Sequence, residues 1–143
     1  FGANPTPLPL GEGFSGMETH MIDGAENNIR SFQSSRHFEA ARYWSQSEHS
    51  YAPDVLLLSR RTYDALEPRD RERLVELARE SVGVMRGMWA EQEEAARRTV
   101  ADSGVRFNDV DIPAFRSTAH PLLADYRLDP TTDALYRRIR ELA

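Results

Sequence analysis

The chain has 143 residues, enough for one ordinary globular domain with its own core. Its composition, 40% hydrophobic and 29% charged, is typical of a folded globular protein and excludes collagen-like and disordered classes. Lysine and arginine number 18 against 23 acidic residues, a net charge of −5, and the sequence contains no concentrated basic run. We therefore expect no nucleic-acid partner.

Cysteine is absent, which excludes disulfides and thiolate metal sites. No apolar run approaches the roughly 20 residues that span a bilayer, so the chain is not expected to be membrane-embedded. The sequence starts at Phe1 without a methionine or a leader, and we interpret this start as a cut.

The first third of the chain is predicted to combine extended and helical segments. Three prolines within residues 4–10 favour an edge strand or an extended loop. Apolar residues at helical spacing predict a short helix over residues 11–22. Residues 25–32 are polar and irregular, and Ser34 or Ser35 then makes a good N-cap for a second short helix with Phe38, Ala41 and Tyr43 on one face.

The middle of the chain carries the strongest patterns. Residues 55–58, Val-Leu-Leu-Leu, are a short continuous apolar run, which predicts a strand buried on both faces in a parallel or mixed sheet. Ser59 can cap one further helical turn. From Pro68 to Ser103 runs the longest helical pattern, with Gly104 as a residue that ends it. Its stripe of side chains could be a coiled-coil seam, but the small and polar second half favours a helix lying across a globular body.

The last third is predicted to hold one strand and two helices. Residues 105–110 alternate as a short strand does. Asp111 caps a helix that Pro121 bends or ends, and Thr132 or Asp133 caps the last helix. The order of strands and helices along the chain predicts an α/β fold.

A search for catalytic or metal-binding patterns is largely negative. Residues 13–17, Gly-Phe-Ser-Gly-Met, are not a nucleophile elbow, because the second glycine follows the serine directly. His20 and Asp23 are three residues apart and could share a metal, but a third ligand at a defined spacing is missing. We therefore expect no metal and no cofactor. His37 and His120 lie beside charged or turn residues and are interpreted as solvated.

Two polar clusters remain unexplained. One is Glu26-Asn27-Asn28, which follows a glycine turn, and the other is residues 47–51, which lead into the apolar run. Buried polar side chains without partners cost about 1–3 kcal/mol each, so such clusters tend to line a cleft or to bind one another. Asparagine offers both donors and an acceptor, which suits carboxylates and hydroxyls together. From the residues alone, an internal polar network and a ligand site are equally good interpretations.

Five motifs follow one another along the chain, at residues 2–12 (GANPTPLPLGE), 22–28 (IDGAENN), 37–43 (HFEAARY), 48–53 (EHSYAP) and 66–70 (LEPRD). In this order and spacing they resemble the DctP-type substrate-binding proteins of TRAP transporters. The resemblance covers essentially the whole chain, and it is specific through the combination of the motifs, since each alone is modest.

The resemblance implies a fold of the type II periplasmic-binding-protein kind. Two α/β lobes, joined by strands and braced by a long helix, close over a small organic acid. Residues 1–52 would be a second-lobe α/β segment with the ligand-facing loop. Residues 53–104 would be a hinge strand and the long helix that spans both lobes, and residues 105–143 would return to the second lobe. Most of the first lobe would be absent from the chain.

The resemblance also implies which residues face the ligand. Asn27 matches the ligand-facing asparagine of the family. Leu10 matches a side chain that packs against the ligand, where many members carry an aromatic residue. Glu26 and His49 match positions of a polar and water network behind the ligand, and Asp54 matches a residue near the cleft at the hinge strand.

The remaining positions are less informative. Asn28 matches a variable position, and it completes the set of candidate ligand-binding residues. The arginine with which the family binds the ligand carboxylate, through its two-pronged guanidinium, would lie upstream of Phe1. Arg30, Arg36 and Arg42 are interpreted as surface residues and do not replace it.

By this resemblance the protein is an extracytoplasmic binder of a small organic acid that works with the membrane subunits of a TRAP transporter. The double asparagine resembles members that bind uronic or aldonic sugar acids. The resemblance implies no catalysis, a periplasmic location with a signal peptide upstream, and a monomer when intact. The alternatives are an α/β enzyme that uses His49, Glu48 or Asp54, and a dimerisation module built around the long helix.

Overall fold

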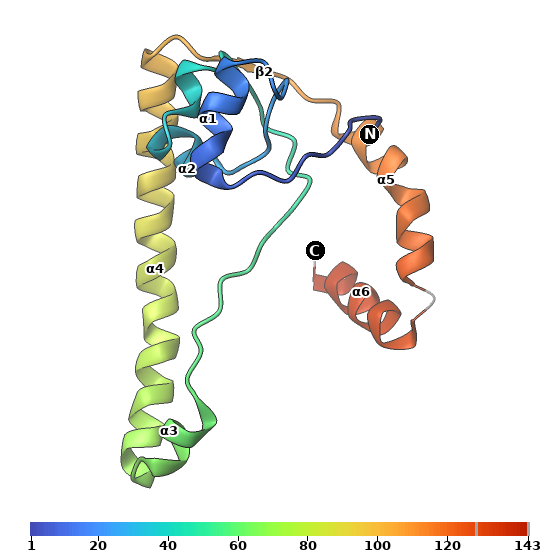
Figure 1. The fold of residues 1–143 in the computed structure, drawn as a ribbon. Coiled ribbons are helices and arrows are strands. Elements are labelled where there is room, and N and C mark those ends of the chain that lie inside the picture. Colours follow the sequence, from blue (N-terminus) through green and yellow to red (C-terminus); the bar gives the residue numbers. More distant parts are fainter. Residues whose placement is uncertain (128, 143) are drawn as a thin grey trace. The chain divides into compact units, whose positions relative to one another are not determined.

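The computed structural model describes residues 1–127 and 129–142. The elements in this part of the chain are α1 Leu10–Glu18, α2 Ile29–Ser34, the 3-10 helix η1 His37–Glu39, β1 Tyr43–Ser45, α3 Arg60–Ala65, α4 Pro68–Asp102, β2 Arg106–Asn108, α5 Ile112–Tyr126 and α6 Pro130–Leu142 (Figure 1). The combination of helices with a sheet confirms the predicted α/β class.

Contacts between residues divide the chain into two compact units. The larger one, called here the helical unit, consists of residues 7–44 and 51–107. The smaller one, called here the C-terminal unit, consists of residues 1–6, 45–50 and 108–143.

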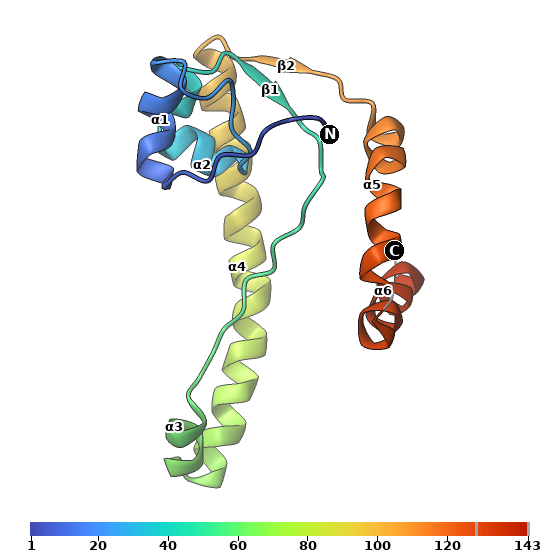
Figure 2. The same cartoon turned by 45° about the vertical axis from the view of Figure 1, so that its right-hand side comes forward.

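The core of the helical unit lies between α2 and the C-terminal end of α4 (Figures 1 and 2). Ile29 and Phe32 of α2 pack with Val100 of α4 and with Val105, and none of the four is more than 6% exposed. Trp44 packs at the edge of this cluster, with its ring centroid 5.0 Å from that of Phe32. A six-residue helix does not persist alone in water, so this burial is what holds α2 in place.

Helix α2 begins at Ile29, within residues 25–32, where the sequence predicted an irregular segment. That prediction was wrong. The side-chain oxygen of Asn28 accepts a hydrogen bond from the backbone N–H of Ser31 at 2.9 Å, which makes Asn28 the N-cap. The cap and the burial of Ile29 together give this short helix its start.

The second predicted helix, starting at Ser34 or Ser35, is also wrong. Arg36 takes a left-handed backbone conformation, with φ of 58°, which interrupts any helix through this point. Only the 3-10 turn His37–Glu39 follows it, and Tyr43, predicted on the face of that helix, begins β1.

Strands β1 and β2 form a two-stranded sheet. The backbone N–H of Arg106 donates to the carbonyl of Arg42 at 2.9 Å, and further along the Ser45 hydroxyl donates to the Asn108 side chain at 3.1 Å. The pairing therefore advances in the same direction along both strands, and the sheet is parallel. Strand β2 confirms the strand predicted within residues 105–110.

The strand predicted at residues 55–58 is not formed. Residues 51–59 are neither helix nor strand, and Val55, Leu56 and Leu57 are 70%, 78% and 81% exposed. A strand needs a neighbour to take up its backbone N–H and C=O groups, and no strand in the described part of the chain pairs with this run. The segment instead forms a long extended link between β1 and α3 (Figures 1 and 2).

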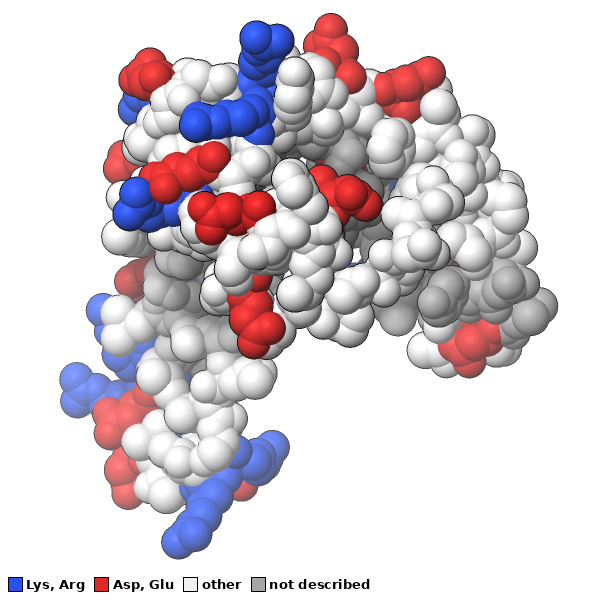
Figure 3. All heavy atoms as spheres, turned by 45° about the horizontal axis from the view of Figure 1, so that its top comes forward, with Lys and Arg blue, Asp and Glu red and all other residues white. Residues whose placement is uncertain are grey.

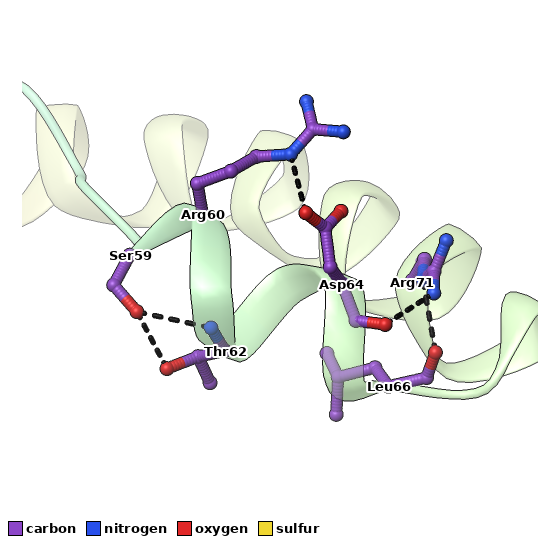
Figure 4. A network of polar contacts seen from close by, with 6 residues as sticks. All are labelled: Ser59, Arg60, Thr62, Asp64, Leu66 and Arg71. Carbon is purple, nitrogen blue, oxygen red and sulfur yellow. Dashed lines mark hydrogen bonds and ion pairs between the residues drawn. The ribbon is translucent and has the colours of Figure 1, made fainter.

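A polar corner joins α3 to α4 (Figure 4). The Ser59 hydroxyl accepts from the backbone N–H of Thr62 at 3.1 Å, which confirms the predicted cap of α3. The guanidinium of Arg71 donates to the carbonyls of Asp64 at 2.6 Å and Leu66 at 2.9 Å. These bonds satisfy carbonyls that the end of a helix leaves without internal partners.

Helix α4 confirms the longest predicted helix. Pro68 lies in its first turn, and Gly104 beyond its end has φ of 88°, a left-handed conformation that glycine adopts at little cost. The middle of α4 is exposed throughout, at residues 79–88, whereas Ala96 and Val100 near its C-terminal end are buried.

The C-terminal unit contains α5 and α6. The carboxylate of Asp111 accepts from the backbone N–H of Ala114 at 3.0 Å, which confirms the predicted cap of α5. Pro121, predicted to bend or end this helix, lies inside it. At the start of the chain, the ring of Phe1 lies 4.9 Å from that of Phe115, centroid to centroid.

The N-cap residue of α6 is Asp129. The prediction that Thr132 or Asp133 caps this helix was therefore wrong. The Asp129 carboxylate accepts from the backbone N–H of Thr132 at 2.7 Å and from its hydroxyl at 2.8 Å. These hydrogen bonds hold the pKa of Asp129 below its usual value. A hydrogen bond from Arg127 does the same for the pKa of Asp133, which also pairs with Arg137 at 2.8 Å.

Candidate ligand-binding site

The segment of residues 24–28 leads directly into α2, and all of its residues are exposed. The side-chain oxygen of Asn27 accepts from the backbone N–H of Asn28 at 2.8 Å and from the Asn28 side-chain amide at 3.3 Å. Within residues 1–127 and 129–142, no hydrogen bond engages the amide nitrogen of Asn27. Asn27 therefore presents a donor to solvent, whereas Asn28 is used as the cap of α2.

The other candidate residues lie on separate segments. Leu10 is the first residue of α1 and is 52% exposed. Asp54 lies in the extended, exposed link of residues 51–59. His49 belongs to the C-terminal unit, where its Nδ1 lies 2.7 Å from the Ser47 hydroxyl. Glu26 is exposed and lies beside Asn27 in the sequence. A direct hydrogen bond joins Asn27 to Asn28, which are both candidate residues.

A shallow hollow of about 210 Å³ lies beside α1. It is lined by Leu8, Glu12, Ser15, Gly16, Thr19 and Met21, none of which is a candidate ligand-binding residue. Sites for small organic ligands usually measure about 300–1,000 Å³. The hollow is therefore too small to be preferred over the segment of residues 24–28.

His37 was interpreted as solvated, and this was wrong, because it is only 3% exposed. Its ring packs against α1 at Gly13, where a Cβ would lie 2.9 Å from the ring carbon Cε1. In the described part of the chain, its Nε2 has no hydrogen-bond partner. His37 is thus a packing residue between η1 and α1, and sequence neighbours gave no sign of this because α1 is remote along the chain.

Other classes of site find little support. Among the described residues, no group of three or more His, Cys, Asp and Glu side chains could hold a metal ion, so the pair His20 and Asp23 has no third partner. No described helix combines the length and the apolar character needed to cross a membrane. Figure 3 shows acidic and basic side chains intermixed on the left-hand side of the face in view.

Arg30 is a residue that the sequence interpretation underrated. It was taken as a surface residue, but it is half-buried, and its guanidinium carbon lies 4.2 Å from the centroid of the Trp89 ring. This contact joins the first turn of α2 to the middle of α4. It could not be predicted, because it depends on where α2 packs.

Known solute-binding proteins resemble this chain in sequence and in structure. The family described as bacterial extracellular solute-binding protein, family 7 (DctP), matches residues 1–129. A curated solute-binding protein from Chromohalobacter salexigens is 36% identical over 122 residues, which are 85% of this chain and 36% of that protein.

Two crystal structures of TRAP periplasmic solute-binding proteins are similar over almost the whole chain. One, from Xanthobacter autotrophicus Py2 with bound β-D-galacturonate, has a TM-score of 0.87 and 40% identity, and the alignment covers 98% of this chain and 47% of that one. The other, from Chromohalobacter salexigens with bound D-glucuronate, has a TM-score of 0.91 and 33% identity, and the alignment covers 99% and 48%.

The chain spans 47% and 48% of the length of these two crystal structures and 36% of the length of the curated relative. All three relatives are named as solute-binding proteins and not as enzymes. With the match over residues 1–129, the chain belongs to the DctP family of bacterial extracellular solute-binding proteins.

Proposed function

We propose that the chain is the C-terminal half of a periplasmic protein that captures a sugar acid, specifically a uronate, for the membrane subunits of a TRAP transporter. The observation that carries this proposal is the similarity, over 98% and 99% of the chain, to two proteins whose structures hold galacturonate and glucuronate. Both ligands combine one carboxylate with several hydroxyls, so their recognition needs many hydrogen-bond donors and acceptors.

In this proposal Asn27 contacts the ligand directly. Its side-chain oxygen is occupied by Asn28, and its amide nitrogen remains as a donor for a hydroxyl or carboxylate oxygen. Asn28 contributes by capping α2, which fixes the backbone beside Asn27. Leu10 supplies an apolar contact, and Glu26, His49 and Asp54 supply polar surroundings.

The proposal includes a two-lobed whole protein. Residues 1–52 belong to the second lobe, residues 53–104 are the hinge strand and long helix, and residues 105–143 return to the second lobe. The exposed run of residues 55–58 supports this division, because such an apolar segment needs partner strands and a large part of the relatives lies outside the present chain. The carboxylate-binding arginine would come from that other part, and the intact protein would be a monomer.

Thermal unfolding of the intact protein tests the ligand class. We expect D-galacturonate or D-glucuronate to raise the melting temperature, because ligand at about 100 times its dissociation constant adds about 2.7 kcal/mol of stability. D-galactose, which lacks the carboxylate, is the matched control and should give no shift. A panel of uronates and aldonates without any shift would remove the sugar-acid assignment.

A further inference from the structure

The position of Asn27 depends on helix α2. Asn28, the next residue, is the N-cap of α2, and its side chain accepts from the backbone N–H of Ser31. One residue therefore separates Asn27 from the first turn of the helix. A six-residue helix owes its place to tertiary contacts, so the contacts of that first turn set where Asn27 lies.

Besides the burial of Phe32 in the core, two contacts hold the first turn of α2. Ile29 is 2% exposed and packs in the core with Val100. Arg30, the next residue, has its guanidinium carbon 4.2 Å from the centroid of the Trp89 ring, close enough for a cation–π contact. Neighbouring residues of an α-helix project about 100° apart around its axis, so the two contacts lie on different sides of the turn.

Trp89 occupies a particular place on α4. The ten residues before it, 79–88, are exposed, and from Trp89 onward the helix is partly covered, with Ala96 and Val100 buried. Arg30 thus meets α4 at the border of the covered part. Burial of Ile29 and Phe32 holds the core-facing side of the short helix, and a planar guanidinium stacked on an indole holds a second side.

We infer that Arg30 and Trp89 form a clamp that holds Asn27 in its ligand-binding position. The two are positioning residues, and the clamp acts on affinity through the first turn of α2 and not through contact with the ligand. This inference rests on the proposed function, because it assumes that Asn27 contacts a uronate.

The test is a set of calorimetric titrations of the intact protein with D-galacturonate and D-glucuronate. The variants are Arg30→Met, Trp89→Leu and the double variant, with Arg30→Lys and Trp89→Phe as conservative replacements. Tyr63→Leu is the matched control, since it breaks a cation–π contact of the same kind, with Arg71 at 5.5 Å, at the other end of α4. Circular dichroism and unliganded melting establish that each variant is folded at the titration temperature.

The expected result is a loss of affinity of about five- to tenfold in Arg30→Met and in Trp89→Leu. The double variant should bind no more weakly than the weaker single variant, because either change opens the same clamp. The conservative replacements should recover most of the affinity, and Tyr63→Leu should bind as the wild type does. A purely structural contact would lower the melting temperature without this pattern in the dissociation constant.

Several results would overturn the inference. Wild-type affinity in Arg30→Met is sufficient by itself, and this variant leaves the core residue Ile29 untouched, so the test does not depend on Trp89→Leu folding. Additive losses in the double variant would mean that Arg30 acts on the ligand directly. If the wild type binds no uronate, the proposed function fails and the clamp with it, whereas a binding wild type with unaffected variants removes the clamp alone.

Discussion

At the scale of single residues, the two adjacent asparagines have different tasks. Asn28 caps α2, and in the proposed function the amide nitrogen of Asn27 donates to the ligand. We predict that Asn27→Ala lowers uronate affinity about tenfold, the usual effect of removing a hydrogen bond to a charged or strongly polar group, and leaves the unliganded melting temperature nearly unchanged. Asn28→Ala should lower the unliganded stability by about 0.5–2 kcal/mol, because it removes the cap.

Titration calorimetry and thermal melting of the two variants separate these tasks. A large loss of unliganded stability in Asn27→Ala would support the alternative that the polar cluster is an internal network. The sequence alone left that choice open, because an asparagine pair after a glycine turn serves either purpose.

A second prediction concerns the contact of His37 with Gly13. A Cβ at Gly13 would lie 2.9 Å from the buried ring, so Gly13→Ala should cost about 1–3 kcal/mol of unfolding free energy through overpacking. Gly11, in the same helix, has nothing within 4 Å of such a Cβ, and Gly11→Ala should be neutral or stabilising by up to about 1 kcal/mol. Denaturant unfolding of the two variants measures the difference, and equal effects would contradict the packing described here.

At the scale of elements, the stability of helix α6 should depend on pH. The pKa values of Asp129 and Asp133 are both lowered from 3.8, by hydrogen bonds from Thr132 and Arg127 respectively. A carboxylate with a lowered pKa stabilises the folded form above its unfolded pKa, and this contribution is lost as the pH falls through the folded value. We therefore predict weaker protection of the α6 amides below about pH 4.

Hydrogen exchange of α6, corrected for the intrinsic rate at each pH, measures this effect. Asp129→Asn is the matched control, because asparagine caps a helix as well as aspartate does but does not titrate there. Protection that stays constant down to pH 3 in the wild type would contradict the role given to the two carboxylates.

Elements with local signals were predicted well. Ser59, Pro68, Gly104 and Asp111 mark the ends of α3, α4 and α5, because capping chemistry needs only a few neighbouring residues. Helix α2 was missed, since a six-residue helix owes its stability to the core formed with Val100, far along the chain. Of the candidate site, the sequence indicated the polar cluster, and the resemblance to a known family singled out Asn27 within it.

At the scale of the whole molecule, the extended link carries a prediction about the intact protein. Residues 55–58 are exposed and unpaired in the described part of the chain, although their pattern is that of a buried strand. We predict slow amide exchange of this run in the intact protein and exchange close to the random-coil rate in residues 1–143 alone. Fast exchange in both would contradict the assignment of a hinge strand.

A stripe of exposed apolar side chains on α4 is explained by the same two-lobed arrangement of the intact protein. Leu74, Leu77 and Met85 are 37%, 44% and 51% exposed, and a two-lobed protein would cover them with its first lobe. A second copy of the chain would cover the same side chains. Light scattering makes the distinction, since the account predicts an intact monomer.

The central claim is that this chain supplies one half of a uronate site. Calorimetric titration of the intact protein and of residues 1–143 alone, with D-galacturonate and D-glucuronate, tests it most directly. The account predicts saturable one-to-one binding by the intact protein, and binding at least about a hundredfold weaker by the isolated segment, which would lack the carboxylate-binding arginine. Equally tight binding by residues 1–143 alone, or no binding by the intact protein, would contradict it.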